Sequence, residues 1–299
     1  MTNVSGSTNK IVAIVIVVVM VSAAAISVML IDLPFEWDDR DELDPILPID
    51  DAIRLNGDEE LREYVSNHSL PGSGTSIDPY IIANLSIVEN GNCIDIRNIE
   101  ASFKIQDCKL KTTLEYSGIA LYLSNCISVR VIRCRTEGGI SGIELFQCDD
   151  AEVIGCLSKF SFFGINSSLS QRISIRESHV SNVTWGISLI GSNDTHLNDT
   201  QLFNNEYGVL SQFSFNCSVT YCNITDNIIG IKLELGCQHW MIHSNVLARN
   251  NEYNAIDDGE SNLWDNDVDF GNWWDDFSGI GPYSVPGLAG SVDRYPQGL

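Results

Sequence analysis

The chain has 299 residues, of which 44% are hydrophobic, so it can bury a sizeable core. Its 40 acidic residues outnumber 17 basic ones and give a formal net charge of −23. This balance excludes nucleic acid and an anionic lipid surface as expected partners, because both repel a polyanion.

The first uncharged stretch indicates a membrane segment. Residues 11–31 are 21 consecutive residues without a charge, and a helix of that length spans about 30 Å of hydrocarbon. Lys10 precedes the stretch and acidic residues follow it. We therefore expect a single-pass protein of the cell membrane, with residues 1–10 as a short cytoplasmic tail, residues 11–31 as an uncleaved signal anchor and the bulk of the chain extracytoplasmic. A signal peptide cleaved near Ala23-Ala24-Ala25 is the alternative.

The next two segments are an expected spacer and an expected cap. Residues 32–56 are acidic, contain three prolines and show no sustained period, which predicts a stalk. Residues 57–78 are predicted to form an N-terminal helical cap, with Asp58 as N-cap and Leu61, Tyr64 and Val65 on one helical face. Such a helix would cover the raw strand edge of a first coil.

A repeat of about 22 residues governs residues 79–258. A Gly-Ile or Gly-Val dipeptide recurs six times, with a first step of 24 residues and four steps of 22. Other columns keep the same step, so residue i lies over residue i+22 at the ~4.8 Å spacing of neighbouring strands. Period-two alternation within each repeat predicts strands, and we expect Gly and Asn at turns with left-handed backbone angles. The prediction is an all-β fold, a parallel β-helix. The columns comprise the glycines 118, 142, 164, 186, 208 and 230, the apolar Val131, Val153, Ile175, Leu197, Val219 and Met241, the small Cys134, Cys156, Ser178, Thr200, Cys222 and Ser244, and the turn residues Asn182, Asn204 and Asp226.

Motifs at both ends of the repeats point to a family. Gly72-Ser73-Gly74-Thr75 and Asp78-Pro79-Tyr80-Ile81-Ile82 precede the repeats, and Gly271-Asn272-Trp273-Trp274-Asp275-Asp276 follows them. Together with the repeats, these motifs resemble the NosD-like family, in an archaeal-type cell-surface form, over roughly residues 55–297. The resemblance implies a right-handed β-helix related to β-helical carbohydrate-binding proteins and sugar hydrolases, and it also implies copper. It is specific for the fold and says little about activity.

Residues 259–299 are predicted to form an aromatic-rich C-terminal cap. Trp264, Trp273 and Trp274 lie there among glycines and prolines. They form either a hydrophobic lid on the last coil or a platform that stacks on sugar rings. Acidic residues of the same segment are candidate calcium ligands, because Ca²⁺ takes several oxygen ligands, although no EF-hand spacing is present. These residues are Asp265, Asp267, Asp269, Asp275 and Asp276.

Nine cysteines raise the question of disulfides and of copper. Pairs such as Cys126 and Cys148 are 22 residues apart, so they would stack at a Cα distance that permits a disulfide. Serines continue the same columns, and we therefore favour buried thiols over disulfides. Copper is not predicted, because only His239 and His243 lie close together and their spacing is not a metal motif. Calcium is the one cofactor that the sequence suggests.

The expected function is a membrane-anchored cell-surface binding or structural module for glycans or surface polymers. One alternative is a polysaccharide hydrolase or lyase acting in a groove, in which Glu177 and Asp199 are stacked carboxylates and His196 is a nearby titratable group. Carboxyl groups ~5–5.5 Å apart suit a retaining glycosidase, but any solvated outward column gives such pairs, so no catalytic residue is assigned. A second alternative is a periplasmic copper-related protein of the NosD type.

Surface glycosylation is also expected outside the membrane. The extracytoplasmic part carries several Asn-x-Ser/Thr sequons, although Asn182 belongs to the turn column and has little room for a glycan. The candidate sites are Asn67, Asn84, Asn166, Asn193, Asn198, Asn216 and Asn223.

Overall fold

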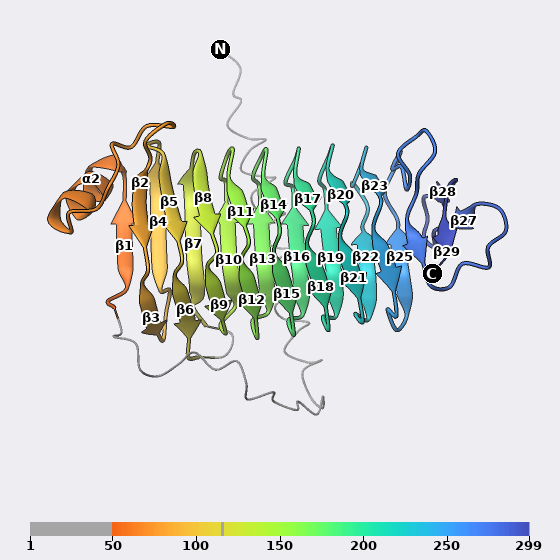
Figure 1. Ribbon diagram of the computed structural model, residues 1–299, viewed down its shortest axis with the longest axis horizontal. Helices are drawn as coiled ribbons and strands as arrows, with labels where there is room; N and C mark the ends of the chain where they lie inside the picture. Colours follow the sequence, from red (N-terminus) through yellow and green to blue (C-terminus); the bar gives the residue numbers. More distant parts are fainter. Residues whose placement is uncertain (1–49, 115–116, 299) are drawn as a thin grey trace, which may run out of the picture. The chain divides into compact units, whose positions relative to one another are not determined.

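The chain folds into a β-helix. The structure is a computed structural model that describes residues 50–114 and 117–298. Within them the chain winds into a right-handed parallel β-helix of about ten coils (Figure 1). The predicted all-β solenoid with coils of about 22 residues is therefore confirmed. In the described part of the chain no helix is long and apolar enough to cross a membrane, and the span expected at residues 11–31 lies outside it.

Three parallel sheets form the sides of the solenoid, and neighbouring strands of each sheet come from successive coils. Sheet A consists of β1 (Ile53–Asn56), β4 (Ile94–Ile99), β7 (Ile119–Cys126), β10 (Ser141–Phe146), β13 (Phe163–Ser168), β16 (Trp185–Ile190), β19 (Tyr207–Gln212), β22 (Ile229–Leu233) and β25 (Tyr253–Asp257). Sheet B consists of β2 (Tyr80–Ala83), β5 (Phe103–Gln106), β8 (Val129–Ile132), β11 (Glu152–Ile154), β14 (Ser174–Arg176), β17 (His196–Asn198), β20 (Ser218–Thr220) and β23 (Met241–His243).

Sheet C is the longest of the three. It consists of β3 (Ser86–Glu89), β6 (Lys109–Thr112), β9 (Arg135–Glu137), β12 (Leu157–Lys159), β15 (His179–Ser181), β18 (Gln201–Phe203), β21 (Asn223–Thr225), β24 (Val246–Ala248), β26 (Trp273–Trp274) and β29 (Gln297–Gly298). A separate antiparallel pair, β27 (Tyr283–Ser284) and β28 (Val292–Asp293), lies in the C-terminal segment. Because β26 and β29 continue sheet C, the solenoid extends beyond residue 258.

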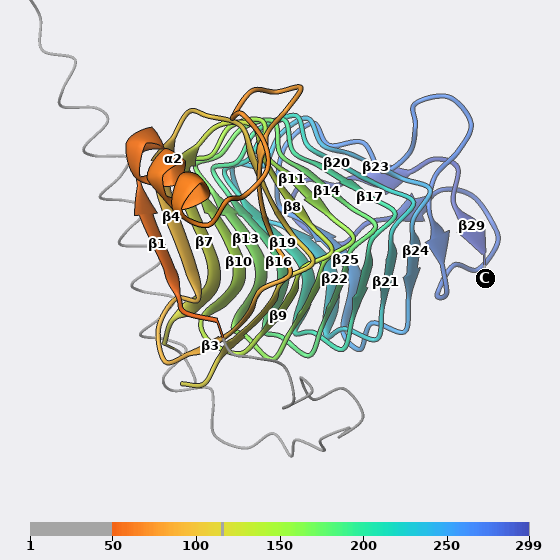
Figure 2. The same cartoon turned by 60° about the vertical axis from the view of Figure 1, so that its left-hand side comes forward.

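The helix α2 (Asp58–Asn67) covers the N-terminal end of the solenoid, as predicted. Figure 2 shows it beside β1 at the first coil, where Leu61 and Val65 are buried. Two details of the prediction are wrong. The N-cap residue is Gly57 and not Asp58, whose Oδ1 instead accepts the backbone N–H groups of Glu100 and Ala101 at 3.0 Å each. The expected stalk also ends earlier, because residues 53–56 form β1 and pair with β4.

The step between coils changes near the C-terminal end. His196 pairs with Ser218, a step of 22 residues, but Ser218 pairs with Met241 and Ile229 with Tyr253, steps of 23 and 24. The apolar column therefore continues from Val219 to Ile242. Ile242 is fully buried, whereas Met241 is 39% exposed, so the inward position predicted for Met241 is wrong.

The repeated glycines are required by close packing between coils. Gly164, Gly186, Gly208 and Gly230 do not have left-handed backbone angles, which corrects the expectation of turn glycines. A Cβ on Gly186 would lie 2.4 Å from the carbonyl oxygen of Gly208, and one on Gly208 would lie 2.5 Å from that of Gly230. Gly118 is the exception, with φ +80°, and it lies outside the column because Gly142 falls opposite Ala120.

Side chains at the corners bond to the neighbouring coil. Asn205 Oδ1 accepts the N–H of Val183 at 3.1 Å, and Asn227 Oδ1 accepts the N–H of Asn205 at 3.0 Å. In the column of small residues, Ser178 Oγ accepts the N–H of Cys156 at 3.1 Å. These corner positions therefore select a short hydrogen-bond acceptor as well as small size. The predicted left-handed turn column is confirmed for Asn182, Asn204 and Asp226, with φ of 55°, 56° and 59°.

Candidate functional site

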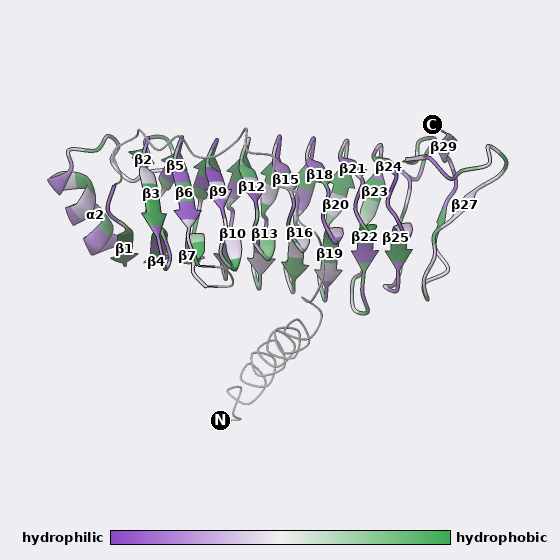
Figure 3. Cartoon of the chain, turned by 90° about the horizontal axis from the view of Figure 1, so that it is seen from below, coloured by the Kyte–Doolittle hydropathy of each residue, from purple (hydrophilic) through white to green (hydrophobic). Residues whose placement is uncertain are grey.

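Basic residues are concentrated in one part of this acidic protein. Residues 97–137 contain seven basic and four acidic side chains, although the whole chain carries −23. Figure 3 shows β6 and β9, the strands of sheet C in these coils, as mainly hydrophilic. Since most surfaces of the chain are acidic, this local excess of positive charge marks the part of the solenoid that attracts anions.

A hollow of about 510 Å³ opens on the outside of these coils, where sheet B turns into sheet C. One lining residue is Gly155, which follows Arg133 and precedes Glu177 in a column of left-handed turn residues with φ of 49°, 61° and 54°. Gly155 has no side chain, so the space that its neighbours in the column fill is left open. The hollow is lined by Asp107, Cys108, Lys109, Arg133, Arg135, Gly155, Cys156, Leu157 and His179.

Two of the lining cations are not neutralised. Lys109 and Arg135 lie directly opposite each other on β6 and β9. Within the described chain neither has an ion-pair partner, and Arg135 is exposed. Like charges opposite each other destabilise a sheet. Nothing in the fold requires this pair, so its position favours a role in binding an anion.

A third cation, Arg133, is held in place at the rim. Its guanidinium donates two hydrogen bonds to Asp107, from Nε at 2.7 Å and from Nη2 at 2.8 Å. These bonds lower the pKa of Asp107 below its ordinary value, so the carboxylate stays charged. The pair fixes one wall of the hollow, and the open cations of the site are Lys109 and Arg135, with His179 two coils further along the same column of sheet C.

The predicted catalytic carboxylates do not form an enclosed site. Glu177 and Asp199 are exposed residues of left-handed turns on successive coils. Glu177 pairs with Arg176 at 2.6 Å. His196 is also exposed, and its Nδ1 lies 2.9 Å from Ser218 Oγ. The register brings the three residues near one another along the solenoid, but the interactions of Glu177 and His196 are with other neighbours.

Two of the three predicted platform tryptophans are inaccessible. Trp264 and Trp274 are both fully buried, so neither indole can stack on a sugar, and the platform prediction is wrong for them. Their Nε1 atoms donate to Asp257 and Asp293 respectively, each at 2.9 Å. They serve as the hydrophobic lid that was the other interpretation. Trp273 is half-buried against Phe270, at a ring-centroid distance of 5.1 Å.

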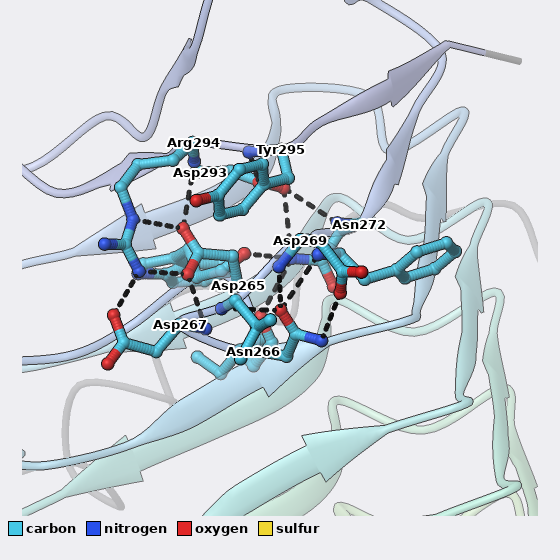
Figure 4. A network of polar contacts seen from close by, with 12 residues as sticks. Asp265, Asn266, Asp267, Asp269, Asn272, Asp293, Arg294 and Tyr295 are labelled. Atoms are coloured by element: carbon cyan, nitrogen blue, oxygen red, sulfur yellow. Dashed lines mark hydrogen bonds and ion pairs between the residues drawn. The ribbon is translucent and has the colours of Figure 1, made fainter.

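The predicted calcium ligands separate into three sets with different partners. Figure 4 shows Arg294 bound to Asp265 and Asp267, at 2.9 Å from Nε and 2.6 Å from Nη2. Asp269 accepts a bond from Asn266 at 3.2 Å, whereas Asp275 and Asp276 both accept from Asn254 Nδ2, at 2.8 and 3.0 Å. Across residues 50–114 and 117–298, no group of three or more His, Cys, Asp or Glu could hold a metal ion.

Burial and hydrogen bonding oppose each other at Asp265. Burial by itself would raise the pKa of this carboxyl, but the bonds from Arg294 outweigh it and hold the pKa below its ordinary value. At Asp293 burial dominates and raises the pKa. Together with Asp257, these carboxylates fasten the last segment to the end of the solenoid.

The cysteines are buried free thiols, as favoured from the sequence. Burial raises the pKa of Cys217 and Cys222 to about 12, which disfavours the thiolate that a soft metal needs. Cys237 lies in the core, whereas His239 and His243 lie on the outside of neighbouring turns and strands. Cys217, Cys222, Cys237, His239 and His243 therefore do not form a site that fits the copper that the resemblance implies.

The sequons differ in accessibility. Asn67, Asn84, Asn216 and Asn223 are exposed. Asn193 and Asn198 are half-buried, and Asn198 Nδ2 donates to Thr220 Oγ1 at 3.0 Å. Asn166 is only 6% exposed, so the prediction of a glycan at this position is wrong.

Sequence reasoning missed the hollow. Lys109 and Arg135 are 26 residues apart, and this irregular coil lies before the regular 22-residue repeat, so the column that joins them is not visible. The excess of basic residues between 97 and 137 was the available signal.

The fold is shared with proteins of known structure. The A-module of mannuronan C-5 epimerase AlgE4 from Azotobacter vinelandii has a TM-score of 0.52 and 10% identity, over 73% of this chain and 74% of that chain. An alginate lyase from Paenibacillus sp. str. FPU-7 has a TM-score of 0.46 and 10% identity, over 82% and 95% of the two chains. No curated protein matches this chain. At such low identity the likeness to the epimerase module shows the fold alone.

A family model provides the closer relationship. The model described as "Periplasmic copper-binding protein (NosD)" matches residues 73–279. This match includes the terminal motifs except for Gly72 and all of the regular coils, and it spans more than half of the chain. The protein therefore belongs to the NosD family.

Proposed function

We propose that this protein is an extracytoplasmic β-helix that binds an acidic polysaccharide, with carboxylates of the polymer held in the hollow at Gly155. The observation that carries the proposal is the pair Lys109 and Arg135, which lie opposite each other without an ion-pair partner in the described chain. The proposal includes attachment to the membrane through residues 11–31, as their composition suggests.

The chemistry of the hollow favours a carboxylate or a similar anion. A guanidinium binds a carboxylate with two parallel hydrogen bonds, and a neighbouring ammonium adds a point charge. A polymer is favoured over a small anion because the hollow is open and extends over several coils. The extracytoplasmic location is supported by the description of the family as periplasmic. The glycan class is supported by the name of the epimerase module with the same fold, which refers to mannuronan.

The test compares one polymer with and without its charges. The full-length chain, purified in mild detergent, is exposed to immobilised polygalacturonate and to the fully methyl-esterified polymer. We expect binding to the polyuronate and at least tenfold weaker binding to the ester. The double variant Lys109→Gln/Arg135→Gln should lose about tenfold or more, since a hydrogen bond to a charged group contributes ~1.5–3 kcal/mol.

Arg62→Gln is the matched control, because Arg62 is an exposed cation on α2 far along the chain from the hollow. It should bind like the unmodified chain. Equal binding of the ester, or a double variant with unchanged affinity, would contradict the proposal.

A further inference from the structure

A row of aromatic side chains lies on a different part of the solenoid, at the N-terminal ends of three neighbouring strands of sheet A. Phe163, Trp185 and Tyr207 are directly opposite one another on β13, β16 and β19. Their ring centroids are 5.0 and 6.4 Å apart, with interplanar angles of 85° and 83°. We call these three residues the aromatic ladder. Phe162 supports it from the side, 5.5 Å from the ring of Trp185.

The ladder lies outside the main hydrophobic core, which includes Ile165, Ile187 and Val209 but none of the three aromatic residues. Phe163 is itself buried, at 9% exposure. Trp185 and Tyr207 nevertheless remain partly exposed, unlike Trp264 and Trp274 in the C-terminal cap. Phe213, Phe215, Tyr221 and Tyr253 are also exposed in these coils, but Trp185 and Tyr207 are directly opposite each other on neighbouring strands.

The charges near the ladder differ from those of the hollow. Burial raises the pKa of the Tyr207 phenol. The carboxylates of Glu206, Glu234 and Glu252 raise this pKa further, whereas the ammonium of Lys232 lowers it. Lys232 lies 5.8 Å from the ring centroid of Tyr207, but it is also paired with Glu234 at 3.3 Å. This surrounding is negative on balance, so it disfavours a carboxylate and favours an uncharged ligand with hydroxyl groups.

The ring arrangement offers a sugar one aromatic face at a time. Trp185 and Tyr207 belong to successive coils, which lie about 4.8 Å apart, and their rings are nearly perpendicular. A sugar ring has an apolar face that packs on an indole or phenol ring, while its hydroxyl groups can bond to carboxylates at the side.

We propose that Trp185 and Tyr207 form a stacking site for uncharged sugar residues, separate from the anion-binding hollow. This inference rests on the proposed function for its polymer class and adds a second chemistry to it. A glycan with both acidic and neutral sugars would use both sites, and a neutral oligosaccharide would use the ladder alone.

The test uses neutral oligosaccharides, which the hollow does not attract. Cellohexaose and mannohexaose are titrated into the full-length chain while tryptophan fluorescence and calorimetric heat are recorded. We expect saturable binding of at least one hexaose and a loss of about tenfold or more in Trp185→Ala, because this substitution removes the indole face on which the sugar ring would pack. Trp185→Phe keeps an aromatic ring and should lose less.

Trp273→Ala is the matched control, since Trp273 is also half-buried but lies outside the ladder. Urea midpoints of all variants separate lost binding from lost folding. Absence of hexaose binding by the unmodified chain, or equal affinity in a folded Trp185→Ala, would overturn the inference. The two proposals can fail separately: Lys109→Gln/Arg135→Gln should keep hexaose binding, and Trp185→Ala should keep binding to polygalacturonate.

Discussion

Replacement of Gly186 by alanine tests how closely the coils are packed. The added Cβ would lie 2.4 Å from the carbonyl oxygen of Gly208 and 3.1 Å from that of Tyr207. Both atoms belong to the backbone of the next strand, which cannot move without breaking hydrogen bonds between β16 and β19. Overpacking costs about 1–3 kcal/mol, and we expect about 2–3 kcal/mol here because no flexible side chain can yield.

The assay is urea unfolding followed by circular dichroism. With a slope of about 2–3 kcal/mol/M, the midpoint of Gly186→Ala should fall by about 1 M. Gly91→Ala is the control, because its Cβ would come no closer than 3.9 Å to another atom and Gly91 has no left-handed angle. A midpoint for Gly186→Ala that equals that of Gly91→Ala would refute the packing explanation for the glycine column.

Three further predictions concern stability and the thiols. Asp265 has a lowered pKa in the folded state, so its contribution to folding stability is present above the ordinary pKa of ~3.9 and is lost as pH falls through the folded value. Arg294→Gln should therefore reduce the fall in urea midpoint between pH 6 and pH 3. An unchanged fall would argue against a stabilising Asp265–Arg294 pair. Asn227→Ala leaves the buried N–H of Asn205 without its acceptor and should cost about 1–3 kcal/mol, whereas the exposed Asn223→Ala should be nearly neutral by the same unfolding assay. The nine buried cysteines should react with a thiol reagent only in denaturant, and fewer than nine equivalents there would reveal a disulfide.

The sequence predicted the solenoid because stacking repeats itself at each coil. Position i+22 meets the same neighbours as position i, so the apolar, small and turn columns were visible without a structure. The left-handed turn at Asn182, Asn204 and Asp226 is one such case. The helix α2 was visible for a different reason, since its own 3.6-residue period places Leu61 and Val65 on one face.

The errors arose where the period changes or where two physical reasons favour the same residue. One extra residue between Ser218 and Met241 shifts the inward position to Ile242, and two neighbouring apolar residues conceal the shift. Glycine suits both a left-handed turn and a close approach of two backbones. The sequence does not distinguish these cases, and the structure assigns Gly186 to the second.

The candidate site depends on contacts that composition does not specify. The hollow requires Gly155 to leave a space between coils, and it requires Lys109 and Arg135 to meet across a coil of unusual length. The tryptophans near the C-terminus were more conspicuous in the sequence. Trp264 and Trp274 are nevertheless fully buried, and their indole N–H groups donate to the buried carboxylates of Asp257 and Asp293.

The distribution of charge leads to a last prediction, on salt. A chain of −23 repels a polyanion at long range, while the hollow attracts it at short range. At ~0.01 M salt the Debye length is about 30 Å, so the charges of the whole chain act on the polymer. At ~0.15 M the Debye length is about 8 Å, so mainly the cations that line the hollow act on it. Affinity for polygalacturonate should therefore be highest at intermediate ionic strength and fall again when ~1 M salt screens the hollow itself. Hexaose binding to the aromatic ladder should stay nearly constant over the same range. A polygalacturonate affinity that rises steadily as salt is removed would show that the acidic remainder of the chain has no influence on the hollow.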